Sequence, residues 1–435
     1  MTATGIGGGF SAGPALGSPL RGRLAVPGDK SISHRALLLA ARADGRSQIT
    51  GLSTGLDVAA TTAAMVAYGA DVERRSPTSV AVTGGPDRLG EPASVIDVGN
   101  SGTALRLLAG WSAGLSGLSV LAGDDSVGAR PMDRVTEPLR AMGATIDGRG
   151  GGRYAPLVIR GGALHGIDYR PPVASAQVKG AILLAGLSAE GRTTVHEPTP
   201  TRTHTEDMLA VAGADVSVAD GAVTVRRSAL RPVDVDVPGD PSQAAFWAVA
   251  ASIVAGSDLV IEHVYVGPGR AGFLAVLERM GADITVEATS RTDRTADLRV
   301  RGALLRGTEV GGAEVAGVID EIPVLAVAAA FAEGITVFAD AAELRVKETD
   351  RIATVTSELR AVGADVTDRP DGLIVVGTGG RPLPGGAVHS HGDHRVAMAL
   401  AVAALATSGG VTIKGWDAVA TSYPGFEEDL HRCRS

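Results

Sequence analysis

The sequence predicts an α/β protein of two domains, built from six copies of one strand–helix–strand–helix–strand unit. Two repeating patterns predict this fold class. A phrase such as "VAGADV" recurs five times, and each copy ends an amphipathic stretch at a glycine before a strand-like Val or Ile. Six nearly continuous apolar, Ala-rich stretches recur beside these phrases. Short alternating segments such as "VAVTGG" and "GLIVVG" lie between them and are typical of strands.

The glycine of the repeated phrase predicts where one helix of each unit ends. Glycine has no Cβ and therefore fits the left-handed position that follows the last turn of a helix. The five glycines are Gly69, Gly143, Gly213, Gly281 and Gly363.

The six apolar stretches predict a second kind of helix, which is buried on all sides because no face of it is polar. They cover residues 33–45, 103–114, 177–191, 242–256, 321–334 and 394–410. Three such units in each domain place the domain boundary near Val237–Pro238. An ordinary doubly wound α/β protein with accidental repeats is the alternative.

The overall composition favours a cytoplasmic protein and excludes several classes. The 435 residues exceed one typical core, and the net charge of −8 without a basic stripe argues against nucleic-acid binding. No apolar run approaches the roughly 18–20 residues of a membrane span. Cys433 is the only cysteine, which excludes internal disulfides and a Cys-rich metal site. The first residues, "MTATGIGGGFSAGPALGSPL", are predicted to be a flexible tail and not a signal peptide.

Polar clusters stand directly before each predicted buried helix. They are "GDKSISHR", "GNSGTALR", "ASAQVK", "PGDPSQ", "IDEIP" and "GDHR". Helix N-termini expose unpaired N–H groups and attract anions. Cations lie at or near these ends, namely Lys30, Arg35, Arg106, Lys179 and Arg395, and Arg130, Lys347 and Arg351 add to them. Each cluster alone fits an ordinary helix cap, but six clusters at equivalent positions predict an anion site in an acidic protein.

These motifs, together with "ARPMDRV" and "LRVKETDR", resemble the 5-enolpyruvylshikimate-3-phosphate synthase family, in particular its class II branch. The resemblance runs in order from about residue 20 to 430. It implies an inside-out α/β barrel fold with three βαβαββ repeats in each of two domains. Residues 1–26, a tail and a strand, would join the domain of residues 239–435, and residues 27–238 would form the other domain.

The family's reaction moves the enolpyruvyl group of phosphoenolpyruvate to the 5-hydroxyl of shikimate 3-phosphate and releases phosphate. It passes through a tetrahedral intermediate by addition and then elimination. The resemblance implies no metal or cofactor, two small-molecule substrates, a monomer, and glyphosate as an inhibitor. The phosphates and carboxylates of the substrates match the predicted anion site.

The resemblance also implies roles for individual residues. Shikimate 3-phosphate would contact Lys30, Ser31, Arg35, Ser175, Ala176, Gln177, Arg202, Asp320 and Lys347. Phosphoenolpyruvate would contact Lys30, Asn100, Gly102, Thr103, Arg130, Gln177, Arg351 and Arg395. The catalytic residues would be Lys30, which stabilises charge, and Asp320, Lys347 and Glu348, which transfer protons. We assign Glu348 to the methylene of phosphoenolpyruvate and Asp320 with Lys347 to the hydroxyl.

Two positions depart from the family pattern, and two other functions compete. Thr421 stands where many members have a lysine, and Leu107 stands where many have a proline. The sister family, UDP-N-acetylglucosamine enolpyruvyl transferase, usually carries a cysteine in a mobile loop, and Cys433 is misplaced for that role. A non-catalytic binder of anionic metabolites would gain nothing from the carboxylates Asp320 and Glu348.

Overall fold

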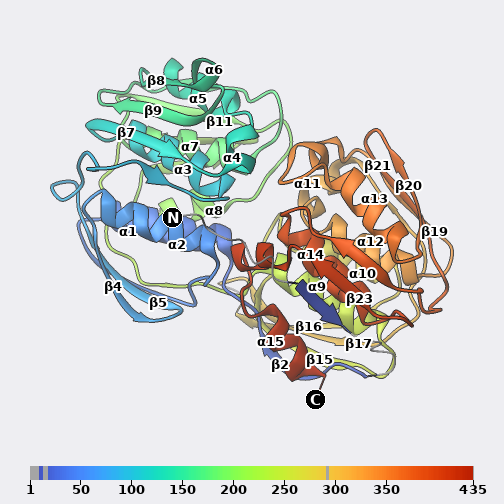
Figure 1. Cartoon of the computed structure of the whole chain (residues 1–435). Helices are drawn as coiled ribbons and strands as arrows, with labels where there is room; N and C mark the ends of the chain where they lie inside the picture. The colour runs from blue at the N-terminus through green and yellow to red at the C-terminus, as the bar shows by residue number, and fades with distance from the viewer. Residues whose placement is uncertain (1–8, 13–17, 291–292, 435) are drawn as a thin grey trace, which may run out of the picture. The chain divides into compact units, whose positions relative to one another are not determined.

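The computed structural model describes residues 9–12, 18–290 and 293–434 (Figure 1). Most of the predicted amino-terminal tail, residues 1–8 and 13–17, lies outside the described residues. The chain divides into two compact units, which we call the central unit and the terminal unit. The central unit is Gly28–Val237, and the terminal unit combines the described residues up to Pro27 with those from Pro238 onwards.

The central unit contains three four-stranded sheets, each with helices between its strands. The first repeat comprises α1 (Lys30–Arg42), β3 (Gly45–Thr50), α2 (Leu56–Ala67), β4 (Asp71–Ser76), β5 (Ser79–Gly84) and β14 (Val235–Asp236). The second comprises β6 (Ile96–Asp97), α3 (Gly102–Ala113), β7 (Gly117–Ala122), α4 (Asp125–Ala129), α5 (Asp133–Ala141), β8 (Thr145–Gly148), α6 (Arg149–Gly152) and β9 (Tyr154–Gly161). The third comprises β10 (Asp168–Tyr169), α7 (Ala176–Gly186), β11 (Arg192–His196), α8 (His204–Val211), β12 (Val216–Ala219) and β13 (Ala222–Arg226).

The terminal unit repeats this plan. Its first repeat comprises β2 (Arg21–Ala25), α9 (Pro241–Ile253), β15 (Asp258–Tyr265), α10 (Gly272–Arg279), β16 (Asp283–Ser290) and β17 (Thr295–Arg301). The second comprises β18 (Glu309–Val310), α11 (Val315–Val318), α12 (Ile322–Phe331), β19 (Ile335–Phe338), α13 (Arg351–Ala361), β20 (Asp365–Arg369) and β21 (Gly372–Val376). The third comprises β22 (Gly386–His389), α14 (His394–Ala404), β23 (Val411–Lys414), α15 (Phe426–Cys433) and β1 (Gly9–Ala12).

Every repeat has one parallel strand pair. In the second repeat, for example, the strand order is β6-β7-β9-β8, and β6 is parallel to β7 while the other neighbours are antiparallel. A buried helix such as α3 makes the crossover between the two parallel strands. Five repeats are therefore βαβαββ, one strand longer than the unit predicted from the repeats alone. The last repeat of the terminal unit has a sheet of three described strands, in the order β1-β23-β22.

Three strands pair with distant parts of the chain, and one of them, β1, is antiparallel to β23. Strand β2, near the amino terminus, pairs in parallel with β15, and Figure 1 shows the two side by side. Strand β14, at the end of the central unit, pairs in parallel with β3. The first repeat of each unit is thus completed by a strand that is remote in sequence.

The six predicted apolar helices are confirmed, and they form the cores. In the central unit α3 contacts both α1 and α7, and in the terminal unit α9, α12 and α14 all contact one another. All ten residues of α12 are buried. Helices α3 and α7 can approach closely because Gly110 has no side chain. A Cβ at Gly110 would lie 2.0 Å from the Ala181 carbonyl oxygen. The predicted helix-ending glycines are confirmed too, since all five have φ between 85° and 107°.

Candidate active site

In the central unit, Lys30 is held at the start of α1. The Asp29 side chain caps this helix by accepting a hydrogen bond from the Ile32 N–H at 2.8 Å. Lys30 is the first helical residue, and its Nζ lies 2.9 Å from Oδ2 of Asp57 on α2. Both side chains are largely buried, so the ion pair fixes the direction of the ammonium group. Nothing in the sequence identified Asp57 as the partner.

Arg35 lies one turn further along α1. Its Nε donates to Thr205 Oγ1 at 2.7 Å, and its Nη1 donates to the Ser31 carbonyl oxygen at 2.9 Å. Arg35 is 3% exposed. The structure therefore brings Arg35 and Ser31 together, as expected, and joins them to the start of α8.

Helices α3 and α7 are linked by a chain of polar contacts. Arg106 Nη1 donates to Gln177 Oε1 at 2.8 Å, and Gln177 Nε2 donates to Thr103 Oγ1 at 2.8 Å. Thr103 and Gln177, both predicted site residues, thus meet. Arg106 was predicted as a cation of the site, but its partner could not be identified from the sequence.

Arg130 lies against the N-terminus of α3. Its Nη2 donates to Ser126 Oγ at 3.0 Å and reaches Asn100 Oδ1 at 3.5 Å. A Cβ placed at Gly102 would lie 2.6 Å from Arg130 Nη1 and 3.1 Å from Arg106 Nη1. Two guanidinium groups therefore converge on a helix N-terminus, an arrangement that suits a phosphate or carboxylate.

Lys179 corrects one expectation. The sequence placed it among the anion-binding cations, but it is 1% exposed. Its Nζ lies 2.6 Å from Glu206 Oε1 and 2.9 Å from Glu197 Oε2, so it is neutralised by protein carboxylates. Burial raises the pKa of Glu206, although the Lys179 charge opposes this.

Three further predicted residues lie beside α7 and α8. Ser175 caps α7 through its Oγ, which accepts from the Val178 N–H at 3.4 Å, and Ala176 is the first residue of that helix. Arg202 is half-buried in the segment that leads into α8.

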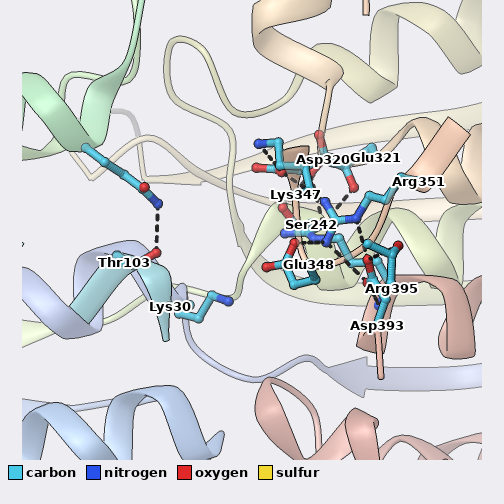
Figure 2. Close-up of polar contacts among 12 residues, drawn as sticks. Lys30, Thr103, Ser242, Asp320, Glu321, Lys347, Glu348, Arg351, Asp393 and Arg395 are labelled. Atoms are coloured by element: carbon cyan, nitrogen blue, oxygen red, sulfur yellow. Dashed lines mark hydrogen bonds and ion pairs between the residues drawn. The ribbon is translucent and has the colours of Figure 1, made fainter. Parts of the chain in front are cut away.

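In the terminal unit, the predicted residues gather around Arg351 (Figure 2). Arg351 is 1% exposed, yet its guanidinium lies near three carboxylates. The distances are 2.7 Å from Nε to Asp393 Oδ2, 2.6 Å from Nη2 to Glu348 Oε2 and 3.5 Å from Nη1 to Asp320 Oδ1. Burial lowers the pKa of Arg351, but the charges of Asp393, Glu348 and Asp320 outweigh it and raise the pKa above the usual value.

Two further cations complete this cluster, namely Lys347, which directly precedes Glu348, and Arg395, two residues after Asp393. Lys347 Nζ lies 3.3 Å from Asp320 Oδ1, and the Lys347 side chain is 28% exposed. Arg395 Nη1 donates to the Asp320 carbonyl oxygen at 2.8 Å and lies 3.7 Å from Glu321 Oε1. The three predicted proton-transfer residues are therefore close neighbours, and all three are partly exposed to solvent.

A layer of polar residues supports this cluster, and the sequence did not identify its connections. Ser242 donates to Glu321, and Arg270 Nη1 donates to Ser242 Oγ at 3.1 Å. Arg270 Nη2 lies 2.6 Å from Asp240 Oδ1. Asp240, Ser242 and Glu321 stood in the helix-start motifs, but no sequence signal pointed to Arg270.

The cations of the central unit suit the binding of anions, and the cluster around Arg351 suits proton transfer. Cations at helix N-termini bind phosphates and carboxylates, and adjacent carboxylate and amine groups can take and return protons. Among the described residues, no group of three or more His, Cys, Asp and Glu side chains is placed to hold a metal ion. No helix in the described part of the chain has the length and the apolar composition needed to cross a membrane.

Comparisons with known proteins point to one family. Residues 14–430 match the sequence profile of EPSP synthase (3-phosphoshikimate 1-carboxyvinyltransferase). The enzyme of that name from Synechococcus sp. (strain JA-3-3Ab) is 54% identical over 426 residues, 96% of this chain and 95% of the relative. The one from Gloeobacter violaceus is 52% identical over 99% of this chain and all of the relative.

Solved structures agree with this relationship. The EPSP synthase of Acinetobacter baumannii superposes with a TM-score of 0.87 at 43% identity, over 98% of each chain. The enolpyruvyl transferase NikO of Streptomyces tendae has a TM-score of 0.78 at 21% identity over 98% of each chain, and so shares the fold. The predicted two-domain enolpyruvyl transferase fold is confirmed.

Proposed function

The chain belongs to the EPSP synthase family, which transfers the enolpyruvyl group of phosphoenolpyruvate to shikimate 3-phosphate, and we propose a role for each polar cluster in that reaction. The single observation that carries the proposal is the cluster of Asp320, Lys347 and Glu348 around Arg351. Anion binding alone would not require two carboxylates among these cations.

Shikimate 3-phosphate is bound mainly by the central unit in this proposal. Ser31 and Arg35 hold its carboxylate, and the fixed position of Arg35 beside Ser31 supports this. Its phosphate and ring contact Ser175, Ala176, Gln177 and Arg202. Ser175 and Ala176 form the N-terminus of α7, where backbone N–H groups attract an anion.

Phosphoenolpyruvate is assigned to two sets of residues. In the central unit these are Lys30, Asn100, Gly102, Thr103, Arg130 and Gln177. The support is the convergence of Arg130 and Arg106 on the N-terminus of α3, beside Gly102. In the terminal unit, Arg351 and Arg395 are assigned to its carboxylate. Arg351 Nη1 makes no hydrogen bond among the described residues, and its ion pair with Asp320 Oδ1 is long, at 3.5 Å.

Proton transfer is assigned to the terminal unit. In the addition step, Asp320 with Lys347 removes the proton of the 5-hydroxyl group. The oxygen of that group bonds to the central carbon of phosphoenolpyruvate, and Glu348 protonates the methylene carbon. In the elimination step, Glu348 takes a proton back from the methyl group and phosphate leaves. The 3.3 Å contact between Lys347 and Asp320 supports their pairing in one task, and Glu348, which contacts Arg351 Nη2 at 2.6 Å, is assigned the other.

A phosphate-release assay tests the function. The purified protein should release phosphate when shikimate 3-phosphate and phosphoenolpyruvate are both present, and should not do so when either is omitted. Turnover with UDP-N-acetylglucosamine would instead favour the sister family. The burial of Cys433 on the last helix speaks against a catalytic loop cysteine. Binding without any phosphate release would identify a non-catalytic protein.

We further propose that the protein works as a cytoplasmic monomer without a metal. Its single cysteine is compatible with a reducing compartment, where disulfides are rare. Sedimentation should give the mass of one chain, 43.9 kDa, and a chelator should leave phosphate release unchanged.

A further inference from the structure

The sequence "GRGGGRY" forms a left-handed turn that the proposed function does not use. Gly150, Gly151 and Gly152 have φ of 63°, 67° and 81°. Three consecutive residues in this region are almost restricted to glycine, because any other L-residue is strained there. We call Arg149–Arg153 the triglycine turn. It joins β8 to β9, two antiparallel strands that a much shorter hairpin could connect.

The triglycine turn is bonded to the segment that carries Arg130, on both sides of that residue. The Arg149 guanidinium donates to the Gly128 carbonyl oxygen. The Met132 N–H donates to the Arg153 carbonyl oxygen at 2.8 Å. Arg130 lies midway between the two attachment points, Gly128 and Met132.

A third arginine fixes the turn itself. Arg140 on α5 donates through Nη2 to the Gly151 carbonyl oxygen at 2.7 Å and to the Ile146 carbonyl oxygen at 2.7 Å. A Cβ at Gly152 would lie 2.6 Å from this Nη2 atom, so the turn and α5 fit closely. The turn is therefore attached to α5 on one side and to the Arg130 segment on the other.

From this geometry we infer that the triglycine turn is a positioning element that sets Arg130 against the N-terminus of α3. The inference rests on the proposed role of Arg130 in binding phosphoenolpyruvate. The turn itself touches no substrate in this proposal. Loosening it should weaken phosphoenolpyruvate binding and leave shikimate 3-phosphate binding unchanged.

Two arginines of the turn form a matched pair for the test. Arg149 and Arg153 are both exposed, and their guanidinium carbons lie 5.3 and 5.5 Å from the centre of the Tyr154 ring. Arg149 also donates to Gly128, whereas the Arg153 side chain makes no hydrogen bond to residues 128–132 in the described structure. Arg149→Gln should raise the KM for phosphoenolpyruvate about 3- to 10-fold, the loss expected for one hydrogen bond. Arg153→Gln should leave it within about twofold.

Further variants distinguish a positioning role of the triglycine turn from a general effect on the stability of the fold. Arg149→Lys should restore part of the affinity, because an ammonium group can also donate to a carbonyl oxygen. Gly151→Ala adds a Cβ with no atom within 4 Å, so it strains the backbone alone, and Gly191→Ala does the same elsewhere in the central unit with φ of 85°. The two variants should lose similar thermal stability, but Gly151→Ala alone should raise the KM for phosphoenolpyruvate.

Arg130→Lys, measured in the same assay, tests the role of Arg130 separately from the role of the triglycine turn. An unchanged KM for phosphoenolpyruvate in Arg130→Lys would refute the proposed role of Arg130, and this inference with it. If Arg130→Lys raises that KM but Arg149→Gln and Arg153→Gln behave alike, the triglycine turn does not position Arg130. An equal rise in the KM of both substrates with Arg149→Gln would also overturn the inference.

Discussion

The guanidinium of Arg351 and the carboxylate of Asp393 form a two-point ion pair inside the terminal unit. Nε lies 2.7 Å from Oδ2, and Nη2 lies 3.2 Å from Oδ1. The side chains are 1% and 0% exposed. Asp393 also caps α14 by accepting from the Arg395 N–H at 2.9 Å, so one carboxylate fixes both arginines that we assign to the phosphoenolpyruvate carboxylate.

Asp393→Asn should therefore lower the stability of the protein strongly. The variant removes the charge that contacts Arg351 at two atoms in the interior, where breaking an ion pair typically costs about 3–5 kcal/mol. The Glu348 and Asp320 carboxylates beside Arg351 should keep the loss towards the lower end of that range. Urea unfolding followed by circular dichroism measures the loss. The exposed pair Arg23–Glu262 offers a control, because Glu262→Gln should leave the unfolding midpoint almost unchanged. Equal midpoints for the two variants would contradict the prediction.

Glu348→Gln and Asp320→Asn should each reduce kcat about 10²- to 10⁴-fold, since each removes one positioned proton-transfer group. The amides keep the size of the side chains and can still accept hydrogen bonds from Arg351 and Lys347. Calorimetric titration should therefore still detect shikimate 3-phosphate with similar affinity. Glu333→Gln, at an exposed site, should keep full activity. Near-normal turnover in Glu348→Gln or Asp320→Asn would refute the role assigned to that residue.

The helices of this fold were predictable because their signals are local. Gly363, for example, follows an amphipathic run and has φ of 97°, as a helix-ending glycine should. The apolar run at 321–334 could only be buried, and α12 is. The exchange of β2 and β14 had no local signal, because parallel pairing of strands remote in sequence depends on the whole topology. The family resemblance predicted that the strand near the amino terminus joins the other domain, but it predicted nothing of this kind for β14.

The sequence named the residues of the candidate site, but it did not indicate their contacts. The motifs named Lys30 and Lys179 alike as cations near helix ends. The structure gives them different partners, since Lys179 is enclosed by Glu197 and Glu206. Arg270 had no signal because it lies in a Gly-Pro-Gly loop and reaches Asp240 only through tertiary packing. Ion pairing between distant segments is not encoded in local spacing.

His34 should make the protein less stable in mild acid. It is fully buried on α1, and burial, with the charges of Lys30 and Arg35, lowers its pKa from 6.5 to about 3 despite the Asp29 carboxylate. The unfolded chain binds a proton at His34 below pH 6.5 that the folded chain does not. The free energy of unfolding therefore falls by up to about 1.4 kcal/mol per pH unit as the pH drops from 6.5 towards 3.

His34→Gln tests this linkage. The variant keeps a polar group near Thr61, which lies 2.7 Å from His34 Nδ1, but cannot titrate. Unfolding free energies measured between about pH 4 and 7 should show a slope smaller by close to one proton than in the wild type. His431→Gln, with a side chain that is 72% exposed, should keep the wild-type slope. Identical slopes for all three proteins would show that His34 does not titrate differently on folding.

Gly102 is expected to control the sensitivity to glyphosate, which competes with phosphoenolpyruvate in this family. Gly102 is the first residue of α3 and is not among the residues with positive φ, so an alanine is compatible with its backbone. Its absent Cβ instead leaves room for Arg130 Nη1, which would lie 2.6 Å away. The ends of two flexible arginines, Arg130 and Arg106, occupy this space, and neither is backbone.

Gly102→Ala should therefore fold normally and push Arg130 away from the N-terminus of α3. The KM for phosphoenolpyruvate should rise, because Arg130 moves, and the inhibition constant of glyphosate should rise more, because a longer molecule also meets the added methyl group. The ratio of inhibition constant to KM, measured for both proteins under the same conditions, is the decisive quantity. Leu107, which lies on the same helix, is unchanged in this comparison, so its effect cancels. A ratio equal to that of the wild type would mean that the methyl group acts through Arg130 alone, and that Gly102 does not discriminate between substrate and inhibitor.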